Sequence, residues 1–380
     1  MAKTKTFKVK VEPKVLKWAL SSSGWEEEEL ILKLKISKKT YFGWLDGLVE
    51  PTIKQLENIS NKIKRPLASL LLSEAPIEPP KPKDYRMLPD KVDKFDKKTV
   101  LAIRKARRLQ KLSKELALNI NDETKPKVEK VTLLDNPNKL GIKYRELFEL
   151  TEEKQKKFKN PYELFNYLRE KLEDNHIFSL KISMPIEDAR GFALADDTPA
   201  ILVVNSADLI TARIFTLLHE FAHLLLGDTA ISIPEFTTTD KRERWCNQFA
   251  ASFLLPEEIA KKIFTETKLT LTESKTLRTL SNRYKVSKAM LLHDMVTLGY
   301  ISNNKFKEII ERPRIEKKES EKKGGVGIPS ENRCISEMGT KFVSLVADNL
   351  DKGYITYGDA LNYLSVKSNK LKAVFRKATK

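Results

Sequence analysis

The sequence predicts a mainly helical α+β protein with a small β-sheet, built from two or three folded units. Three observations lead to this prediction. Apolar residues recur at helical spacing along most of the chain. Only two segments have the composition of strands. At 380 residues, the chain is too long for one ordinary small domain, and two polar stretches interrupt its helices.

The N-terminal part reads as a bundle of short helices. Helices are expected at 12–22, 25–34 and 37–46, followed by a fourth helix that ends before Pro66. A Pro-rich stretch then begins at Ala75 and marks a linker. Residues 1–74 are therefore predicted to form a helix-turn-helix bundle. Residues 75–159 are predicted to form the linker and a helical connector.

A second domain is predicted for residues 160–312. Strands are expected at 176–182 and 200–205, separated by a turn-forming segment that ends at Pro199. Two strong helices follow, at about 209–226 and 240–253, and then a helical region to about 311. Residues 313–330 are charged and Gly-containing, so they are predicted to be a flexible linker before a small helical C-terminal unit at 331–380.

Composition narrows the class of protein. The 70 Lys and Arg residues exceed the 52 Asp and Glu residues and give a net charge of +18, which favours a polyanionic partner, although Lys-rich surfaces also serve solubility. No apolar run approaches the length of about 18 residues that a membrane helix needs, and no export signal is visible. The only cysteines, Cys246 and Cys334, lie far apart, so no disulfide framework is expected. We expect a cytoplasmic protein with no membrane partner.

A metal site is predicted by the H-E-x-x-H pattern at His219, Glu220 and His223. Residues four positions apart share one helix face, so the two imidazoles can bind one Zn²⁺ while Glu220 lies beside the water that a catalytic zinc retains. The alternative is a coincidental pair of core histidines. Burying these groups in so apolar a helix without a metal or strong partners would cost several kcal/mol.

The third ligand is predicted to be Glu243, on the next helix and on its apolar face. Asp228 and Asp240 are the next residues to test. Cys246 is close enough in sequence to approach the metal, but it is expected to be a small core residue. The two other histidines, His176 and His293, are expected to be structural or surface residues. Mn²⁺ or Fe²⁺ in place of zinc is left open, since two His and one carboxylate suit several metals.

The order of these motifs resembles the ImmA/IrrE family of metallopeptidases. The resemblance covers roughly residues 160–300 and is carried by Gly191 to Leu194, Phe215 to His223, and Glu243 to Pro256. Carried over by position, it implies that His219, His223 and Glu243 bind the metal and that Glu220 is the catalytic acid and base. It further implies a zincin-like fold and site-specific cleavage of a DNA-bound repressor.

The N-terminal helices resemble a Cro/CI-type helix-turn-helix of the XRE group. Ser37 is the expected N-cap of the third helix, and Trp44 is expected in the core. In such modules the third helix enters the major groove by its first residues. The predicted contacts with double-stranded DNA are Lys38, Lys39, Thr40 and Tyr41. The acidic run from Glu26 to Glu29 departs from the pattern, because it would repel phosphate, so a helical protein-interaction module is the alternative.

These predictions favour a DNA-binding zinc endopeptidase that acts on a repressor or antitoxin-like protein. The alternative is a transcriptional regulator whose metal site is structural or sensory and which has no significant proteolysis. Glu220 beside both histidines favours the enzyme, since a structural zinc has no use for a base there. A toxin and antitoxin fused in one chain, and a homodimer, are compatible with the same order of domains.

Overall fold

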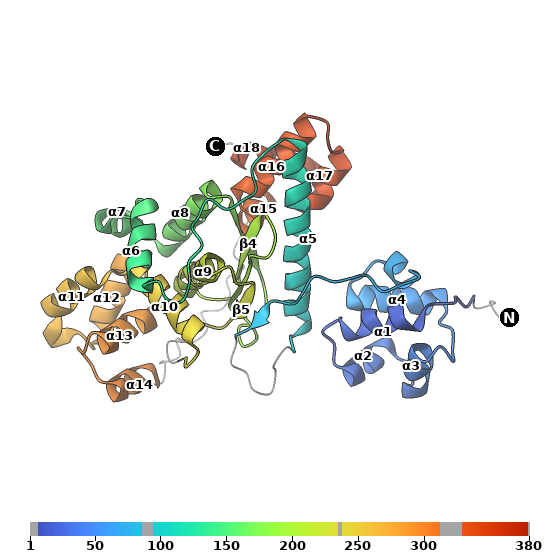
Figure 1. Ribbon diagram of the computed structural model, residues 1–380, viewed down its shortest axis with the longest axis horizontal. Helices are drawn as coiled ribbons and strands as arrows, with labels where there is room; N and C mark the ends of the chain where they lie inside the picture. Colours follow the sequence, from blue (N-terminus) through green and yellow to red (C-terminus); the bar gives the residue numbers. More distant parts are fainter. Residues whose placement is uncertain (1–6, 86–93, 235–237, 312–328, 379–380) are drawn as a thin grey trace. The chain divides into compact units, whose positions relative to one another are not determined.

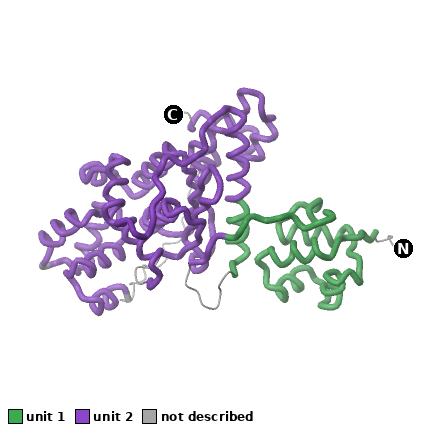
Figure 2. The backbone as a smooth tube through the Cα atoms, in the orientation of Figure 1, with its two compact units in different colours: residues 1–81, 88–105 green, residues 82–87, 106–380 purple. Residues whose placement is uncertain are grey.

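The computed structural model describes residues 7–85, 94–234, 238–311 and 329–378. Within these residues it has eighteen α-helices and one mixed five-stranded sheet, so the predicted mainly helical α+β class is confirmed. The chain divides into two compact units (Figure 2), residues 1–81 with 88–105 and residues 82–87 with 106–380. Of the predicted linker at 313–330, all but the last two residues lie outside the described part of the chain.

The N-terminal unit is built from four short helices and a 3-10 turn. The helices are α1 (Pro13–Ser21), α2 (Glu27–Leu34), α3 (Lys38–Leu45) and α4 (Ile53–Ile63), followed by η1 (Leu67–Leu70). Lys35, in the left-handed region at φ 58°, ends α2. Ser37 then caps α3 by accepting a hydrogen bond from the Thr40 amide at 3.1 Å. Trp44 is buried in the core of this unit, as expected.

The second unit contains the sheet. Its strands are β1 (Lys83–Asp84), β2 (Ile177–Ile182), β3 (Gly191–Leu194), β4 (Ala200–Asn205) and β5 (Ala230–Ser232), in the spatial order β1-β5-β3-β4-β2. β3 runs antiparallel to its neighbours β4 and β5, whereas β2 with β4 and β1 with β5 are parallel pairs. The sequence predicted β2 and β4. It missed β1, β3 and β5, because two to four residues are too few to show strand periodicity.

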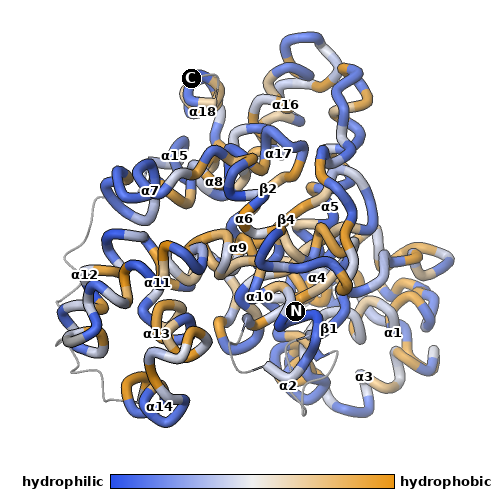
Figure 3. The backbone as a smooth tube through the Cα atoms, turned by 60° about the vertical axis from the view of Figure 1, so that its left-hand side comes forward, coloured by the Kyte–Doolittle hydropathy of each residue, from blue (hydrophilic) through white to orange (hydrophobic). Residues whose placement is uncertain are grey.

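Two buried helices position the site. Helix α9 (Ile210–Leu225) packs against β3 and β4, and α10 (Lys241–Leu254) packs against α9 (Figure 1). Apolar residues run along α9 in Figure 3, and every residue from Ile214 to Leu225 is buried. A helix that is apolar on nearly every side must lie in a core, so the polar groups between Ile214 and Leu225 are forced into the interior.

Helix α5 (Lys97–Asn119) begins in the N-terminal unit and ends in the second unit. The remaining helices of the second unit before residue 312 are α6 (Pro137–Leu147), α7 (Glu152–Lys157), α8 (Pro161–Asp174), α11 (Glu257–Glu266), α12 (Ser274–Tyr284), α13 (Lys288–Thr297) and α14 (Asn303–Glu311), with the short turn η3 (Lys268–Thr270). The C-terminal helices are α15 (Ser330–Met338), α16 (Thr340–Asp351), α17 (Tyr357–Leu364) and α18 (Ser368–Ala378). Glu173 of α8 accepts hydrogen bonds from the Thr340 and Lys341 amides at the start of α16, which fixes the C-terminal helices to α8. None of the described helices is long and apolar enough to cross a membrane.

Candidate metal centre

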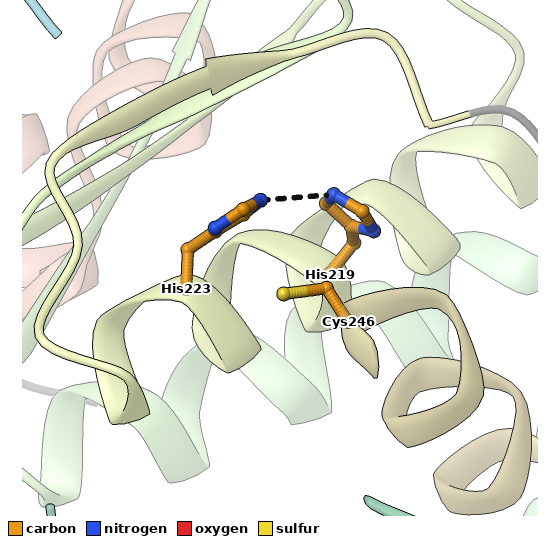
Figure 4. Close-up of side chains that lie close together, drawn as sticks. All are labelled: His219, His223 and Cys246. Carbon is orange, nitrogen blue, oxygen red and sulfur yellow. Dashed lines mark hydrogen bonds between the residues drawn. The ribbon is translucent and has the colours of Figure 1, made fainter. Parts of the chain in front are cut away.

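Three polar residues of helix α9, His219, Glu220 and His223, lie close together in the interior. His219 and His223 lie one turn apart, and their Nε2 atoms approach to 3.2 Å (Figure 4). Both histidines and Glu220 have an exposed fraction of 0%. The structure thus brings together the three α9 residues that the H-E-x-x-H spacing predicts.

Glu243 reaches the same space from α10. Asp240 begins this helix by accepting hydrogen bonds from the Arg242 and Glu243 amides. One turn in, the Glu243 carboxylate lies 3.2 Å from His219 Nε2 and 2.9 Å from His223 Nε2. Burial alone would raise its pKa, but the adjacent histidines hold that pKa at about 2. Glu243 is therefore a carboxylate at neutral pH.

The spacing of these atoms fits a tetrahedral metal. With bonds of about 2.0–2.2 Å, a zinc ion keeps its ligand atoms about 3.3–3.6 Å apart, close to the 2.9–3.2 Å found here. Glu243 Oε1 is also buried without an aligned hydrogen bond among the described residues, although His223 Nε2 is near. Two imidazole nitrogens and a carboxylate gathered this closely in the interior form a donor set that suits a divalent metal.

Cys246 offers a fourth donor at this centre. Its Sγ lies within 4.8 Å of ligand atoms of both histidines, and its exposed fraction is 0% (Figure 4). His219, His223 and Cys246 therefore form a buried group that could hold a metal. Burial raises the pKa of the Cys246 thiol, so the metal-free protein keeps it protonated. The Glu243 oxygens lie 2.9–3.2 Å from the imidazole nitrogens, well inside the 4.8 Å that bounds the position of Cys246 Sγ. This difference favours Glu243 as the third ligand.

The two alternative aspartates are engaged elsewhere. Asp228 forms ion pairs with Arg242 at 2.6 Å and with Lys83 at 3.5 Å, and Asp240 caps α10. The other two histidines are also occupied outside the centre. His176 approaches the Glu123 carbonyl at 2.5 Å, and His293 lies beside Asp294.

Two residues orient the histidines, and the sequence did not single out either for this role. His219 Nδ1–H donates to Asn247 Oδ1 at 2.9 Å, which leaves Nε2 facing the centre. Asn247 follows Glu243 by one helical turn, so the period of α10 was a signal that could have identified it. Tyr85 stacks on His223, with ring centroids 5.6 Å apart and planes at 9°. It lies 138 positions before His223, and no local pattern connects the two.

Glu220 is held beside the metal space by β5. The Ser232 hydroxyl donates to Glu220 Oε1 at 2.6 Å, while Oε2 has no hydrogen-bond partner among the described residues. Burial raises the pKa of Glu220 to about 8. Strand β3 passes so near that a Cβ atom on Gly191 would lie 2.5 Å from Thr216 Cγ2 and 2.9 Å from Glu220 Oε1. Only glycine fits there.

The predicted DNA contacts lie on the first turn of α3 in the N-terminal unit. Lys38 and Lys39 are exposed and Thr40 is half-buried. Lys38 pairs with Glu28 at 2.7 Å, so part of the acidic run on α2 is neutralised within the protein. Tyr41 does not fit the prediction, because it is 4% exposed and packs in the core of the unit. We therefore exclude Tyr41 from the contact set.

Two histidines and a carboxylate on two packed helices, with a buried glutamate beside them, are the groups that a metallopeptidase-type centre requires. A family model, Peptidase_M78, described as the IrrE N-terminal-like domain, matches residues 173–295. The match supports the resemblance to the ImmA/IrrE family and a metallopeptidase-type function for this domain; it covers less than half of the chain and leaves out the N-terminal helices. No curated protein and no solved structure matches the chain.

Proposed function

We propose that this chain is a zinc-dependent endopeptidase whose N-terminal unit binds double-stranded DNA. The observation that carries the proposal is the convergence of His219, His223 and Glu243, whose ligand atoms lie 2.9–3.2 Å apart with Glu220 beside them. His219, His223 and Glu243 would hold the ion. Mn²⁺ or Fe²⁺ would suit the same donors.

A bound divalent ion would supply Lewis-acid polarisation of a peptide carbonyl and would acidify water. Glu220 is placed to take a proton from that water and to return it to the leaving amine. Burial holds the pKa of Glu220 at about 8 in the metal-free site, and a cation bound beside it would lower that pKa and free the carboxylate to accept a proton near neutral pH. The Ser232 hydroxyl fixes one oxygen of Glu220 and leaves the other for this transfer.

The substrate that we propose is a repressor or antitoxin-like protein, and the setting is transcriptional regulation in the cytoplasm. The family match over 173–295 supports the peptidase part of this proposal. The exposed Lys38 and Lys39 on the first turn of α3, together with the net charge of +18, support the DNA-binding part.

A second candidate is a transcriptional regulator with a structural or sensory metal and no significant proteolysis. One observation favours it: the centre is wholly buried, with exposed fractions of 0–1% at His219, Glu220, His223 and Glu243. A structural metal has no substrate to admit, so a centre without exposed surface suits that role.

Cleavage in cells separates the two candidates. Protein N-termini would be compared between cells that express the wild type and cells that express Glu220→Gln, which removes the base but preserves the shape of the side chain. We expect at least one new internal N-terminus with the wild type only, and equal metal content in the two purified proteins. Identical sets of N-termini, both for the wild type and for a variant whose centre is open to substrate, would refute the peptidase and leave the regulator.

A further inference from the structure

The candidate centre is closed to substrate in this conformation. A peptide carbonyl must come within about 3–3.5 Å of the reacting groups. His219, Glu220 and His223 have no exposed surface, and Glu243 is 1% exposed. Some covering element must therefore move before a substrate can reach the centre.

Strand β5 and the short strand β1 cover it. β5 lies directly on the centre, because Ser232 is bonded to Glu220. β1 is the outermost strand of the sheet and pairs with β5 in parallel, Lys83 opposite Ala230. The Lys83 amide donates to the Thr229 carbonyl at 2.9 Å and the Tyr85 amide to the Ile231 carbonyl at 3.1 Å.

Side chains extend this cover to His223. The Tyr85 ring stacks on the His223 imidazole, and burial raises the pKa of Tyr85. Lys83 pairs with Asp228 at 3.5 Å, and the Asp228 amide donates to the His223 carbonyl at 2.9 Å. Backbone, aromatic and charged contacts from Lys83 and Tyr85 thus meet at the end of α9 that carries a proposed metal ligand.

The covering segment is connected in sequence to the N-terminal unit on both sides. Residues 82–87 belong to the second unit, but the chain before them (1–81) and after them (88–105) belongs to the N-terminal unit. The cover is therefore tethered at both ends to the unit that we propose binds DNA. The cover is also small, because its strand has two residues and two amides, those of Lys83 and Tyr85, donate to the carbonyls of Thr229 and Ile231. So short an edge strand can leave without loss of the sheet behind it.

We propose that Lys83–Tyr85 is an internal strap that keeps the peptidase latent by occupying the outer edge of β5 above His223. Rearrangement of the N-terminal unit withdraws the strap. The backbone groups of β5 that it leaves unpaired then receive an extended segment of the protein substrate. This inference rests on the proposed peptidase function for its purpose, but the closed state and its release can be measured without catalysis.

The test measures access to His223 in the full-length, metal-free protein. The reagent is diethyl pyrocarbonate, and its rate of reaction at His223 is followed by peptide mass spectrometry. The release variant combines Lys83→Pro, which removes one amide donor, with Tyr85→Ala, which removes the stacked ring. We expect modification of His223 to be at least about tenfold faster than in the wild type, because a backbone hydrogen bond, an ion pair and an aromatic contact are lost together.

Matched variants isolate the strap. Tyr85→Phe keeps the ring and should behave as the wild type, and Ile77→Pro places a proline in the same linker at a fully exposed residue. Tyr85→Ala alone should give an intermediate rate. Deuterium exchange along α9 must stay slow in all variants; loss of its protection would assign the exposure of His223 to unfolding and overturn the proposal.

The outcomes separate the strap from the peptidase. Equal rates at His223 in the wild type and the release variant would overturn the strap, whatever the cleavage data show. A faster rate at His223, with no cleavage by any zinc-loaded variant, would support the strap and refute the peptidase. A faster rate together with higher cleavage in the zinc-loaded release variant would support both.

Discussion

At the scale of single residues, the candidate centre was largely predictable because its signals are local. The spacing of His219 and His223 depends only on the period of one helix. Glu243 was found from its place on the apolar face of the next helix. Tyr85 could not be found in this way, since its contact with His223 depends on the pairing of two short strands far apart in the sequence.

The identity of the third ligand gives the first prediction. Glu243→Gln should lower zinc affinity by more than the 10–100-fold that is typical of outer-shell changes, because the neutral amide replaces the carboxylate that lies 2.9–3.2 Å from both imidazoles. Elemental analysis and a chelator titration would measure the loss. Arg244→Gln, at the exposed neighbouring residue, should retain the wild-type affinity.

Cys246 supplies the decisive comparison for this prediction. It is the other donor that the structure brings to the histidines, so Cys246→Ser should leave zinc affinity nearly unchanged if Glu243 is the ligand. The reverse result, with full affinity in Glu243→Gln and a large loss in Cys246→Ser, would move the third ligand to the sulfur.

A second prediction at this scale concerns Lys181, whose ammonium group donates to the Ser336 hydroxyl of α15. Burial, and then the nearby Arg169 and Arg213, lower its pKa from 10.5 to about 8. Between about pH 8 and 10.5 the unfolded chain therefore binds more protons than the folded one. The contribution of Lys181 to the free energy of unfolding should rise with pH across this window.

The comparison with Lys181→Met isolates this contribution from the many other titrating groups. The free energy of unfolding, measured by urea titration at intervals of pH, should rise more steeply for the wild type than for the variant above pH 8. Below pH 8 the difference between the two proteins should be constant. A difference that stays flat from pH 8 to 10.5 would show that the pKa of Lys181 is not lowered.

At the scale of elements, the long helices were predictable and the short strands were not. The prediction of 240–253 became α10 at Lys241–Leu254, because helical periodicity and the Asp240 cap are both local. β3 has four residues, too few to show the alternation of a strand, and it is held by pairing with β4 on one side and β5 on the other. The only signal of its position was Gly191, whose meaning depends on contacts with α9 and β4.

Gly191 gives the prediction for this scale. Gly191→Ala should lower the free energy of unfolding by about 1–3 kcal/mol, since the new methyl group would meet Thr216 Cγ2 at 2.5 Å and the Val203 carbonyl at 2.9 Å. Thermal or urea unfolding would measure it. Thr216→Ser removes the nearer of these atoms and should restore part of the loss. Gly358→Ala is the control, because the nearest atom to its new methyl group would lie 3.7 Å away, and it should be neutral or slightly stabilising. An equal loss of stability in both variants would show that the loss in Gly191→Ala does not come from the close approach of β3 to α9.

The turn between α2 and α3 is not unique in the chain, and this limits what its geometry can say about function. Lys35, Lys285 and Ser365 each end a helix in the left-handed region, and each is followed by an apolar residue and a further helix. The hairpin of α12 and α13 lies, except for its last two residues, within the segment that matches the peptidase family. Helix-turn-helix geometry therefore does not by itself establish DNA binding; the charges on the second helix must support it.

At the scale of the whole molecule, the sequence predicted the order of folded parts but not the path between them. The Pro-rich stretch correctly indicated an end to the first helices, yet β1 follows it directly and joins the sheet of the second unit. Pairing of two residues with a strand almost 150 positions later leaves no trace in composition. The division into 1–74, 75–159, 160–312, 313–330 and 331–380 stays a prediction.

The net charge of +18 is a property of the whole chain, so a test must show whether the lysines of α3 contribute specifically to DNA binding. We expect binding of double-stranded DNA with log K falling linearly with log salt. Lys38→Ala with Lys39→Ala should weaken binding and reduce the magnitude of the slope by about 1.8 if each lysine neutralises one phosphate.

Lys130→Ala with Lys275→Ala removes the same charge from exposed residues of the second unit and should leave the slope unchanged. Fluorescence anisotropy with labelled DNA at several salt concentrations gives both slopes, and Glu220→Gln should match the wild type because it lies in the other unit. Equal slopes for the two double variants would show a response to net charge alone, and the absence of binding at low salt would favour a protein-interaction role for α3.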